Sequence, residues 1–302
     1  MKRFEITKRA TSAIFVALIL IGCNGKNGDA KDGKNGKDST ENESANPPVG
    51  VYDNAIFSIP SPIQLSSIIQ HSGAPYNFQM LNAANKVDLY TATASQALNL
   101  GIYGADLGYA TLYDNQQEAL KYMKSSKKLA DIIGISEAFD DKTIQQIERN
   151  LDNKDSVLFL VSNSYRKADD FLQIRERKHI GALIIVGGWI ESIYFAANIG
   201  KIKKTPEISN LIGMQKHTLE TILDKMLINY VNEPGVEELY MDLEGIRASF
   251  EKVEIKYEYV KPKHNKATKT TEILSKTSVS IDDATFLEIG KKIEALRKKI
   301  IL

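Results

Sequence analysis

The chain has 302 residues, of which 39 are basic and 38 acidic, and its formal net charge is +1. A balance this close to neutral gives no long-range attraction toward phosphate backbones, so the composition excludes electrostatically driven nucleic-acid binding. Cys23 is the only cysteine of the sequence, so disulfide bonds within the chain cannot support the fold.

The first 23 residues have the pattern of a bacterial lipoprotein signal. Basic residues stand at 2–3 and 8–9, and an apolar segment follows over residues 10–22. It ends in Leu20-Ile21-Gly22-Cys23, with the cysteine where a lipobox needs its acceptor thiol. We expect residues 1–22 to be a lipoprotein signal peptide and Cys23 to carry palmitate-type acyl chains. An ordinary cleaved signal or a transmembrane helix is the alternative, but residues 10–22 fall short of the roughly 20 residues that span a bilayer.

The expected location is the cell envelope. Each buried acyl methylene contributes about 0.8 kcal/mol, so several chains would hold the protein on a membrane. Asn24 follows the cysteine, whereas in well-studied sorting systems an aspartate there retains lipoproteins in the inner membrane. By this resemblance the outer membrane is favoured, and the leaflet stays open.

A polar segment separates the predicted anchor from the rest of the chain. Residues 24–50 are rich in Gly, Asn, Lys, Asp and Ser and contain no aromatic residue. Such a composition cannot bury enough apolar surface to offset its conformational entropy, so residues 23–50 are predicted to be a disordered tether. A flexible coil of this length spans roughly 30 Å. Residues 51–302 are expected to form a single helical domain.

The apolar residues of the body recur at the spacing of helices almost throughout. Ser61-Pro62, Asp114, Asp140-Asp141, Pro206 and Asp282 are predicted to begin or cap helices. The predicted fold class is all-α, a multi-helix bundle or an array of helical hairpins. A small β-hairpin near the C-terminus would pair residues 254–260 with residues 278–281, because residues 254–260 alternate polar with apolar. The lysine-rich residues 261–270 are expected to be an exposed loop.

Residues 180–199 are apolar on all sides and form the second long hydrophobic run. A membrane span is one interpretation of this run. Glu191 near its middle would cost about 2.5–3.5 kcal/mol at a bilayer centre, and Gly181, Gly187 and Gly188 suit close helix packing. We therefore favour the central helix of the core.

Two similar segments each place an acid three residues before a tyrosine. Asp106 precedes Tyr109 and Glu191 precedes Tyr194, and a glycine lies shortly upstream of each acid. The favoured interpretation is that both acids are hydrogen-bonded within the core and fix helix register. The alternatives are catalysis and a small-molecule pocket, and for the pocket the candidate residues are Tyr103, Asp106, Tyr109, Trp189, Glu191 and Tyr194. The spacing of about 85 residues hints at an internal duplication.

Other chemical motifs are weak. His217 and Glu220 share a helical face, but the order and number differ from the paired Glu-x-x-His of di-iron bundles. His71, His179 and His264 have no metal-ligand spacing. Nucleophile elbows and phosphate-binding glycine loops are absent from the sequence. We expect no catalytic residue, metal or cofactor.

The run Leu100-Gly-Ile-Tyr-Gly-Ala-Asp-Leu107, together with Gly187-Gly-Trp-Ile-Glu-Ser192, resembles a group of uncharacterised all-helical lipoproteins of Gram-negative bacteria. The likeness covers most of residues 57–226 and implies a helical, lipid-anchored protein without implying an activity. The expected function is a non-enzymatic binding or scaffold component of the cell envelope. A ligand-binding lipoprotein with a polar pocket around Asp106 and Glu191 is the alternative. The expected partners are the membrane, through Cys23, and an envelope protein or small ligand.

Overall fold

The described structure begins with a short antiparallel hairpin. A computed structural model describes residues 49–52, 55–265 and 270–302. The predicted signal peptide, Cys23 and the tether up to residue 48 lie outside the described residues. Strand β1 (Val49–Tyr52) pairs with β2 (Ala55–Ser58), so regular structure starts two residues before the predicted start of the body.

Helices account for most of the described chain, which confirms the predicted all-α class. The α-helices are α1 (Pro62–His71), α2 (Thr93–Leu112), α3 (Gln116–Ile132), α4 (Asp141–Arg149), α5 (Lys154–Ile174), α6 (Lys178–Ile202), α7 (Pro206–Thr221), α8 (Val236–Phe250) and α9 (Asp283–Ile301). Short 3₁₀ turns lie at Phe78–Met80, Ala84–Leu89, Ser136–Phe139 and Ile228–Tyr230, and a π-helical turn at Ile222–Leu227 extends α7.

Polar side chains set the helix boundaries. Ser61 accepts a hydrogen bond from the Gln64 backbone, and the Gln64 side chain returns one to the Ser61 backbone. This capping box satisfies donors that the first turn leaves free. Asp140 caps α4 and Asp282 caps α9, as predicted. The predicted cap at Asp114 is wrong by one residue, because Asn115 caps α3 while Asp114 takes a positive φ of 59°.

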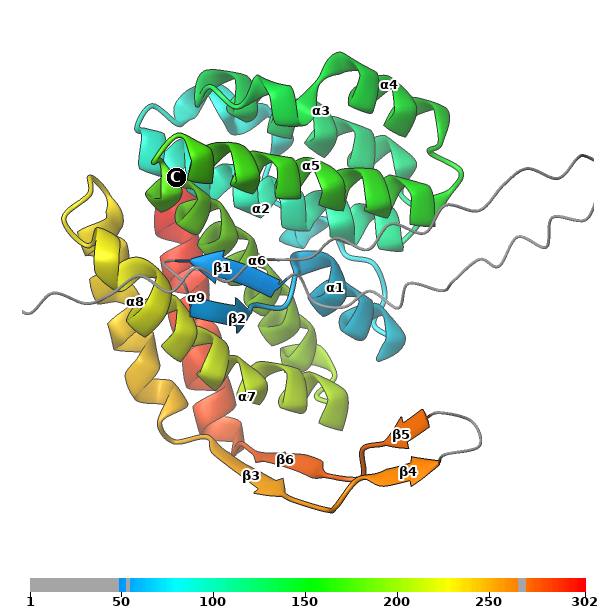
Figure 1. The fold of residues 1–302 in the computed structure, drawn as a ribbon, viewed down its shortest axis with the longest axis vertical. Coiled ribbons are helices and arrows are strands. Elements are labelled where there is room, and N and C mark those ends of the chain that lie inside the picture. The colour runs from blue at the N-terminus through cyan, green and yellow to red at the C-terminus, as the bar shows by residue number, and fades with distance from the viewer. Residues whose placement is uncertain (1–48, 53–54, 266–269) are drawn as a thin grey trace, which may run out of the picture. The chain divides into compact units, whose positions relative to one another are not determined.

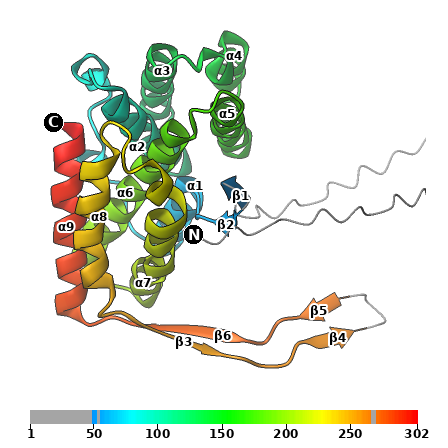
Figure 2. The same cartoon turned by 60° about the vertical axis from the view of Figure 1, so that its left-hand side comes forward.

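Helix α6 forms the centre of the fold and packs against α2, α9, α1, α5 and α7 (Figure 1). Helices α8 and α9 lie side by side, and α3 packs on α2 away from them (Figure 2). By length and composition α6 could cross a membrane, yet 89% of its most apolar window is buried inside the described structure. The burial agrees with the interpretation of residues 180–199 as a core helix.

Helices α2 and α6 approach each other closely because both carry glycine at their crossing. A Cβ atom at Gly101 would overlap the carbonyl oxygen of Ile184, and one at Gly187 would overlap that of Leu98. The close approach brings the two acid-containing segments of the sequence side by side. It is therefore the backbone, through its glycines, that positions the candidate site.

The predicted C-terminal hairpin is confirmed and is longer than expected. Strand β3 (Glu254–Glu258) pairs antiparallel with β6 (Lys276–Ser280), with Ile255 opposite Val279. The prediction of a loop over residues 261–270 is wrong at its two ends, where β4 (Lys263–Asn265) pairs with β5 (Thr270–Glu272). Backbone pairing continues there because Thr residues on β5 suit an extended strand.

Candidate functional site

Both acids of the paired motifs lie in the interior, where α2, α6 and α9 meet. Asp106 on α2 and Glu191 on α6 are each 0% exposed. A lone carboxylate is costly to bury, so each one needs a partner or must become neutral. The two acids satisfy this requirement in different ways.

Glu191 is paired with Arg297 of α9. The arginine Nε donates to Glu191 Oε2 at 2.5 Å, and its Nη2 donates to Glu191 Oε1 at 2.6 Å. The same Nη2 donates to the Met80 carbonyl at 2.8 Å. The Arg297 side chain is 8% exposed, so this two-point ion pair is shielded from solvent. Bidentate geometry and burial make it a strong contact between α6 and α9.

Asp106 has a different environment. Its carboxyl group lies close to Glu191 and the Asn82 backbone, yet neither of its oxygens has a partner in full hydrogen-bond geometry among the described residues, and the same is true of the buried Oδ1 of Asn82. Burial, and next the charge of Glu191, raises the pKa of Asp106 well above its usual range. Burial also raises the pKa of Glu191, but there the guanidinium of Arg297 opposes the rise. We assign the proton to Asp106 and the negative charge to Glu191, since only Glu191 touches the cation.

The three candidate tyrosines are occupied by contacts of their own. The Tyr103 hydroxyl donates to the Ala83 carbonyl at 2.9 Å, and the Tyr109 hydroxyl accepts from the Asn77 backbone at 3.1 Å. The Tyr194 ring lies 4.0 Å from the guanidinium carbon of Arg297, a cation–π contact. These contacts hold the rings as parts of the packed core.

Trp189 differs from the other candidates because its polar atom is bonded to a residue of α7. Its indole nitrogen donates to Gln215 Oε1 of α7 at 3.0 Å, and both residues are buried. The structure thus gathers Tyr103 and Tyr194 around Asp106 and Glu191. It packs Tyr109 among the rings of Tyr76, Tyr113 and Phe195, and it ties the polar atom of Trp189 to α7.

Arg297 and Asn82 are the two residues of this polar cluster that the sequence did not reveal. Asn82 donates to the Tyr90 hydroxyl at 3.0 Å and to Asn99 Oδ1 at 3.2 Å. Arg297 lies between lysines in a strongly charged stretch, so its charge alone does not distinguish it from exposed basic residues. One signal was available, because Ile293, Arg297 and Ile300 share one helical face and the flanking lysines do not.

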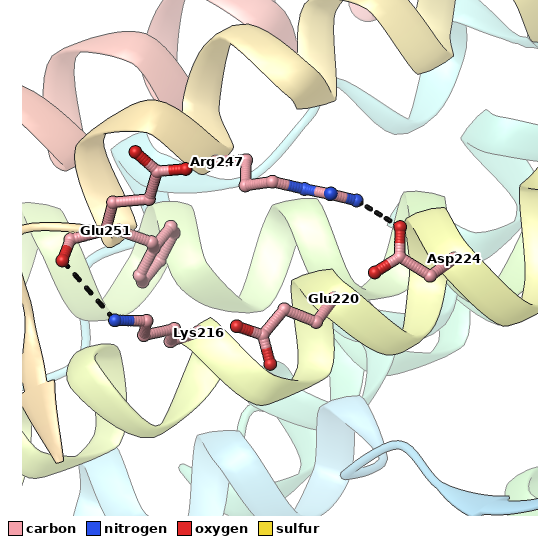
Figure 3. Close-up of a pocket in the computed structure, with 6 residues that line it drawn as sticks. Lys216, Glu220, Asp224, Arg247 and Glu251 are labelled. Carbon is pink, nitrogen blue, oxygen red and sulfur yellow. Dashed lines mark hydrogen bonds and ion pairs between the residues drawn. The ribbon is translucent and has the colours of Figure 1, made fainter.

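A second polar site is a surface hollow of about 210 Å³ between α7 and α8 (Figure 3). Its charged groups are Lys216, Glu220, Asp224, Arg247 and Glu251, above the ring of Phe250. Arg247 Nη2 donates to Asp224 Oδ1 at 2.5 Å, and Lys216 Nζ donates to the Val253 carbonyl at 2.8 Å. Contacts within the chain therefore occupy most of the charges at this hollow.

The histidines form no metal centre in the described part of the chain, where no cluster of three or more His, Cys, Asp or Glu side chains could hold an ion. His217 Nδ1 lies 3.0 Å from Glu220 Oε2 on the exposed side of α7. This pair is a solvated contact on the helix surface.

Fold and site together define an all-α protein whose central polar cluster is closed from solvent. Comparison with models of protein families, with curated proteins and with solved structures finds no match. The resemblance to helical lipoproteins and the ligand-pocket hypothesis both stay predictions.

Proposed function

We propose that this chain is a lipid-anchored, non-enzymatic binding or scaffold component of the cell envelope. Acyl chains on Cys23 hold it on the membrane, and the helical body presents its surface to a partner. The outer membrane is the proposed location, because Asn24 rather than an aspartate follows the cysteine.

One observation carries the non-enzymatic part of the proposal. The acids that the sequence singles out are 0% exposed, and Glu191 is engaged in two hydrogen bonds with Arg297. A substrate would have to displace Arg297 and open the contact between α6 and α9 to reach them. The geometry of Glu191 supports a role in fixing how α6 and α9 pack together.

The anchoring part rests on the basic opening, the short apolar segment and Cys23. Fatty-acid labelling of cells that produce the full chain tests it. We expect label on the wild-type protein and none on Cys23→Ser, which should accumulate with residues 1–22 attached. Ser12→Ala, a change within the same leader, is the matched control and should label normally. Label on Cys23→Ser equal to wild type would overturn the proposal.

A ligand-binding lipoprotein is the second candidate, and a specific observation favours it. Both oxygens of Asp106 and the Oδ1 of Asn82 are buried polar atoms without a hydrogen-bond partner among the described residues. A protonated carboxyl beside an amide oxygen suits a small polar ligand that both donates and accepts hydrogen bonds. Thermal-shift screening of polar metabolites against wild type and Asp106→Asn tests this. A compound that stabilises only the wild type would support the pocket, whereas equal stabilisation of both would remove Asp106 from it.

A further inference from the structure

The C-terminal hairpin has one face that begins in the core and ends in solvent. We call the described residues 254–265 and 270–280 the arm. Ile255 and Val279 are partly buried against the core, and Val279 fills the space that a side chain at Gly213 of α7 would need. Tyr257 and Tyr259 follow on the same face at steps of two and are 66% and 68% exposed.

The outer part of the arm is held in shape although it is exposed. The Ser275 hydroxyl donates to the Val260 carbonyl at 3.2 Å and accepts from the Val260 backbone at 3.1 Å. Ile273 nearby is 76% exposed. Figures 1 and 2 both show the strands running out from the side of the molecule where α9 begins, opposite its C-terminal end. Large apolar and aromatic side chains on an ordered, solvent-exposed hairpin indicate a contact surface.

The charge of the arm is opposite in sign to that of the remaining chain. The arm holds four lysines and three glutamates, a net charge of +1, whereas residues 23–302 hold 35 basic and 37 acidic residues. Lys261, Lys263 and Lys276 form no ion pair among the described residues. The arm is thus a positively charged element on a chain that is otherwise negative, which favours an anionic partner surface.

We propose that the arm rests on an anionic phospholipid surface, with Tyr257 and Tyr259 at the level of the headgroups and Lys261 and Lys263 against the phosphates. This inference rests on the proposed anchor, because a tether that spans roughly 30 Å keeps the arm at high effective concentration next to the bilayer. Tyrosine suits this interface, since its ring is apolar and its hydroxyl is polar.

Pairing of the open strand edges with a second copy is the competing explanation. Lysines on a hairpin commonly protect its edges from such pairing, which accounts for the lysines alone. The exposed tyrosines lie on the face of the arm and not on its edges, so edge protection does not account for them. The lipid surface accounts for both features.

A reporter on the arm separates these cases. In the full chain with Cys23→Ser, Thr277→Cys creates a single thiol on the tyrosine face for an environment-sensitive dye, and Thr277 lies opposite Tyr257. Ile174→Cys, at an 83% exposed position on α5, is the matched control reporter. The probes are vesicles of phosphatidylcholine alone and of an equal mixture with phosphatidylglycerol.

We expect a blue shift of the arm reporter on anionic vesicles and no shift of the α5 reporter. Lys261→Gln with Lys263→Gln should weaken the arm response about 30-fold, and Tyr257→Ser with Tyr259→Ser should abolish the shift. Emission of the arm reporter that does not shift although the chain floats with the vesicles would overturn the proposal. An equal shift with polyglutamate in place of vesicles would overturn it as well, and so would a shift that depends only on protein concentration. Because Cys23→Ser is not acylated but keeps residues 1–22, the leader itself can bring the chain to vesicles. A shift that occurs at the arm reporter and not at the α5 reporter therefore tests the arm separately from any anchor.

Discussion

At the level of single residues, Arg297 is the side chain on which the buried cluster depends. Replacing it with leucine leaves Glu191 buried without a cation, and breaking a buried pair in this way costs about 3–5 kcal/mol. We therefore expect Arg297→Leu to lower the free energy of unfolding by that amount, measured by urea denaturation. Lys299→Leu, two residues along the same helix at an exposed ion pair, should change little. A similar loss in both variants would contradict the special role of Arg297.

The double variant Glu191→Leu with Arg297→Leu removes the whole ion pair, whereas Arg297→Leu alone leaves the Glu191 carboxylate buried without a cation. Apolar residues of similar volume often replace a buried ion pair at little cost. We expect the double variant to be clearly more stable than Arg297→Leu alone. Additive losses would show that Glu191 and Arg297 act independently, against the two hydrogen bonds between them.

Asp106 gives a prediction with a defined pH dependence. An aspartate in the unfolded chain has a pKa of about 3.9, and burial holds the folded pKa of Asp106 above that. Its contribution to stability is therefore full below about pH 4 and is lost as the pH rises toward the folded pKa. Between these two pKa values, the free energy of unfolding of Asp106→Asn should rise relative to that of wild type by up to about 1.4 kcal/mol for each pH unit.

Unfolding by urea at about pH 5 and about pH 7 measures this difference. Burial raises the pKa of the neighbouring Tyr76 to about 12 and those of Tyr103 and Tyr122 further. These tyrosines do not titrate in the range of the test, and Arg297 stays charged. If the free energy of unfolding changes equally with pH in wild type and in Asp106→Asn, the assignment of the proton to Asp106 is wrong.

At the level of elements, the crossing of α2 and α6 depends on glycine. Alanine at Gly101 or Gly187 would force a carbonyl oxygen of the facing helix away, and overpacking of this kind costs about 1–3 kcal/mol. Gly245→Ala on α8 is the matched control, since nothing lies within 4 Å of its added Cβ. That change should be neutral or stabilising by up to about 1 kcal/mol through helix propensity. Thermal unfolding of the three variants distinguishes these outcomes.

The helices themselves could be predicted from the sequence because their signals are local. Ser61, Asp140 and Asp282 mark helix starts through side-chain caps, and Pro206 marks another. The extension of the hairpin through β4 and β5 was missed, since a lysine-rich segment carries no apolar alternation. The β4–β5 pairing is also shifted by one residue from the register of β3 and β6, since Glu258 pairs with Lys276 but Lys263 pairs with Glu272.

The candidate site could be predicted only in part. The matched acid and tyrosine motifs singled out Asp106 and Glu191, and the structure brings both into one interior cluster where α2 and α6 pack together. The partner of Glu191 could not be predicted in the same way, because Arg297 is 106 residues away in the sequence. Contacts over such separations depend on how α9 packs on α6, and local periodicity does not record that.

At the scale of the whole molecule, the arm should be separable from the helical body. Replacing residues 257–277 with an Asn-Gly turn keeps Ile255 and Val279, which pack on the core. We expect helical content by circular dichroism and the midpoint of thermal unfolding to match wild type, while vesicle response is lost. A large fall in the midpoint would instead make the arm a structural support of the body.

The proposed place of the protein in the cell envelope depends on where the mature chain begins and which groups its first residue carries. Mass analysis of the N-terminal peptide of the protein, extracted from membranes of the producing cell, tests this most directly. We predict a peptide that begins at Cys23 and carries the added mass of a diacylglyceryl group and its fatty acids. An unmodified peptide, or one that retains residues 1–22, would contradict the lipid anchor and with it the proposed place of the protein in the cell envelope.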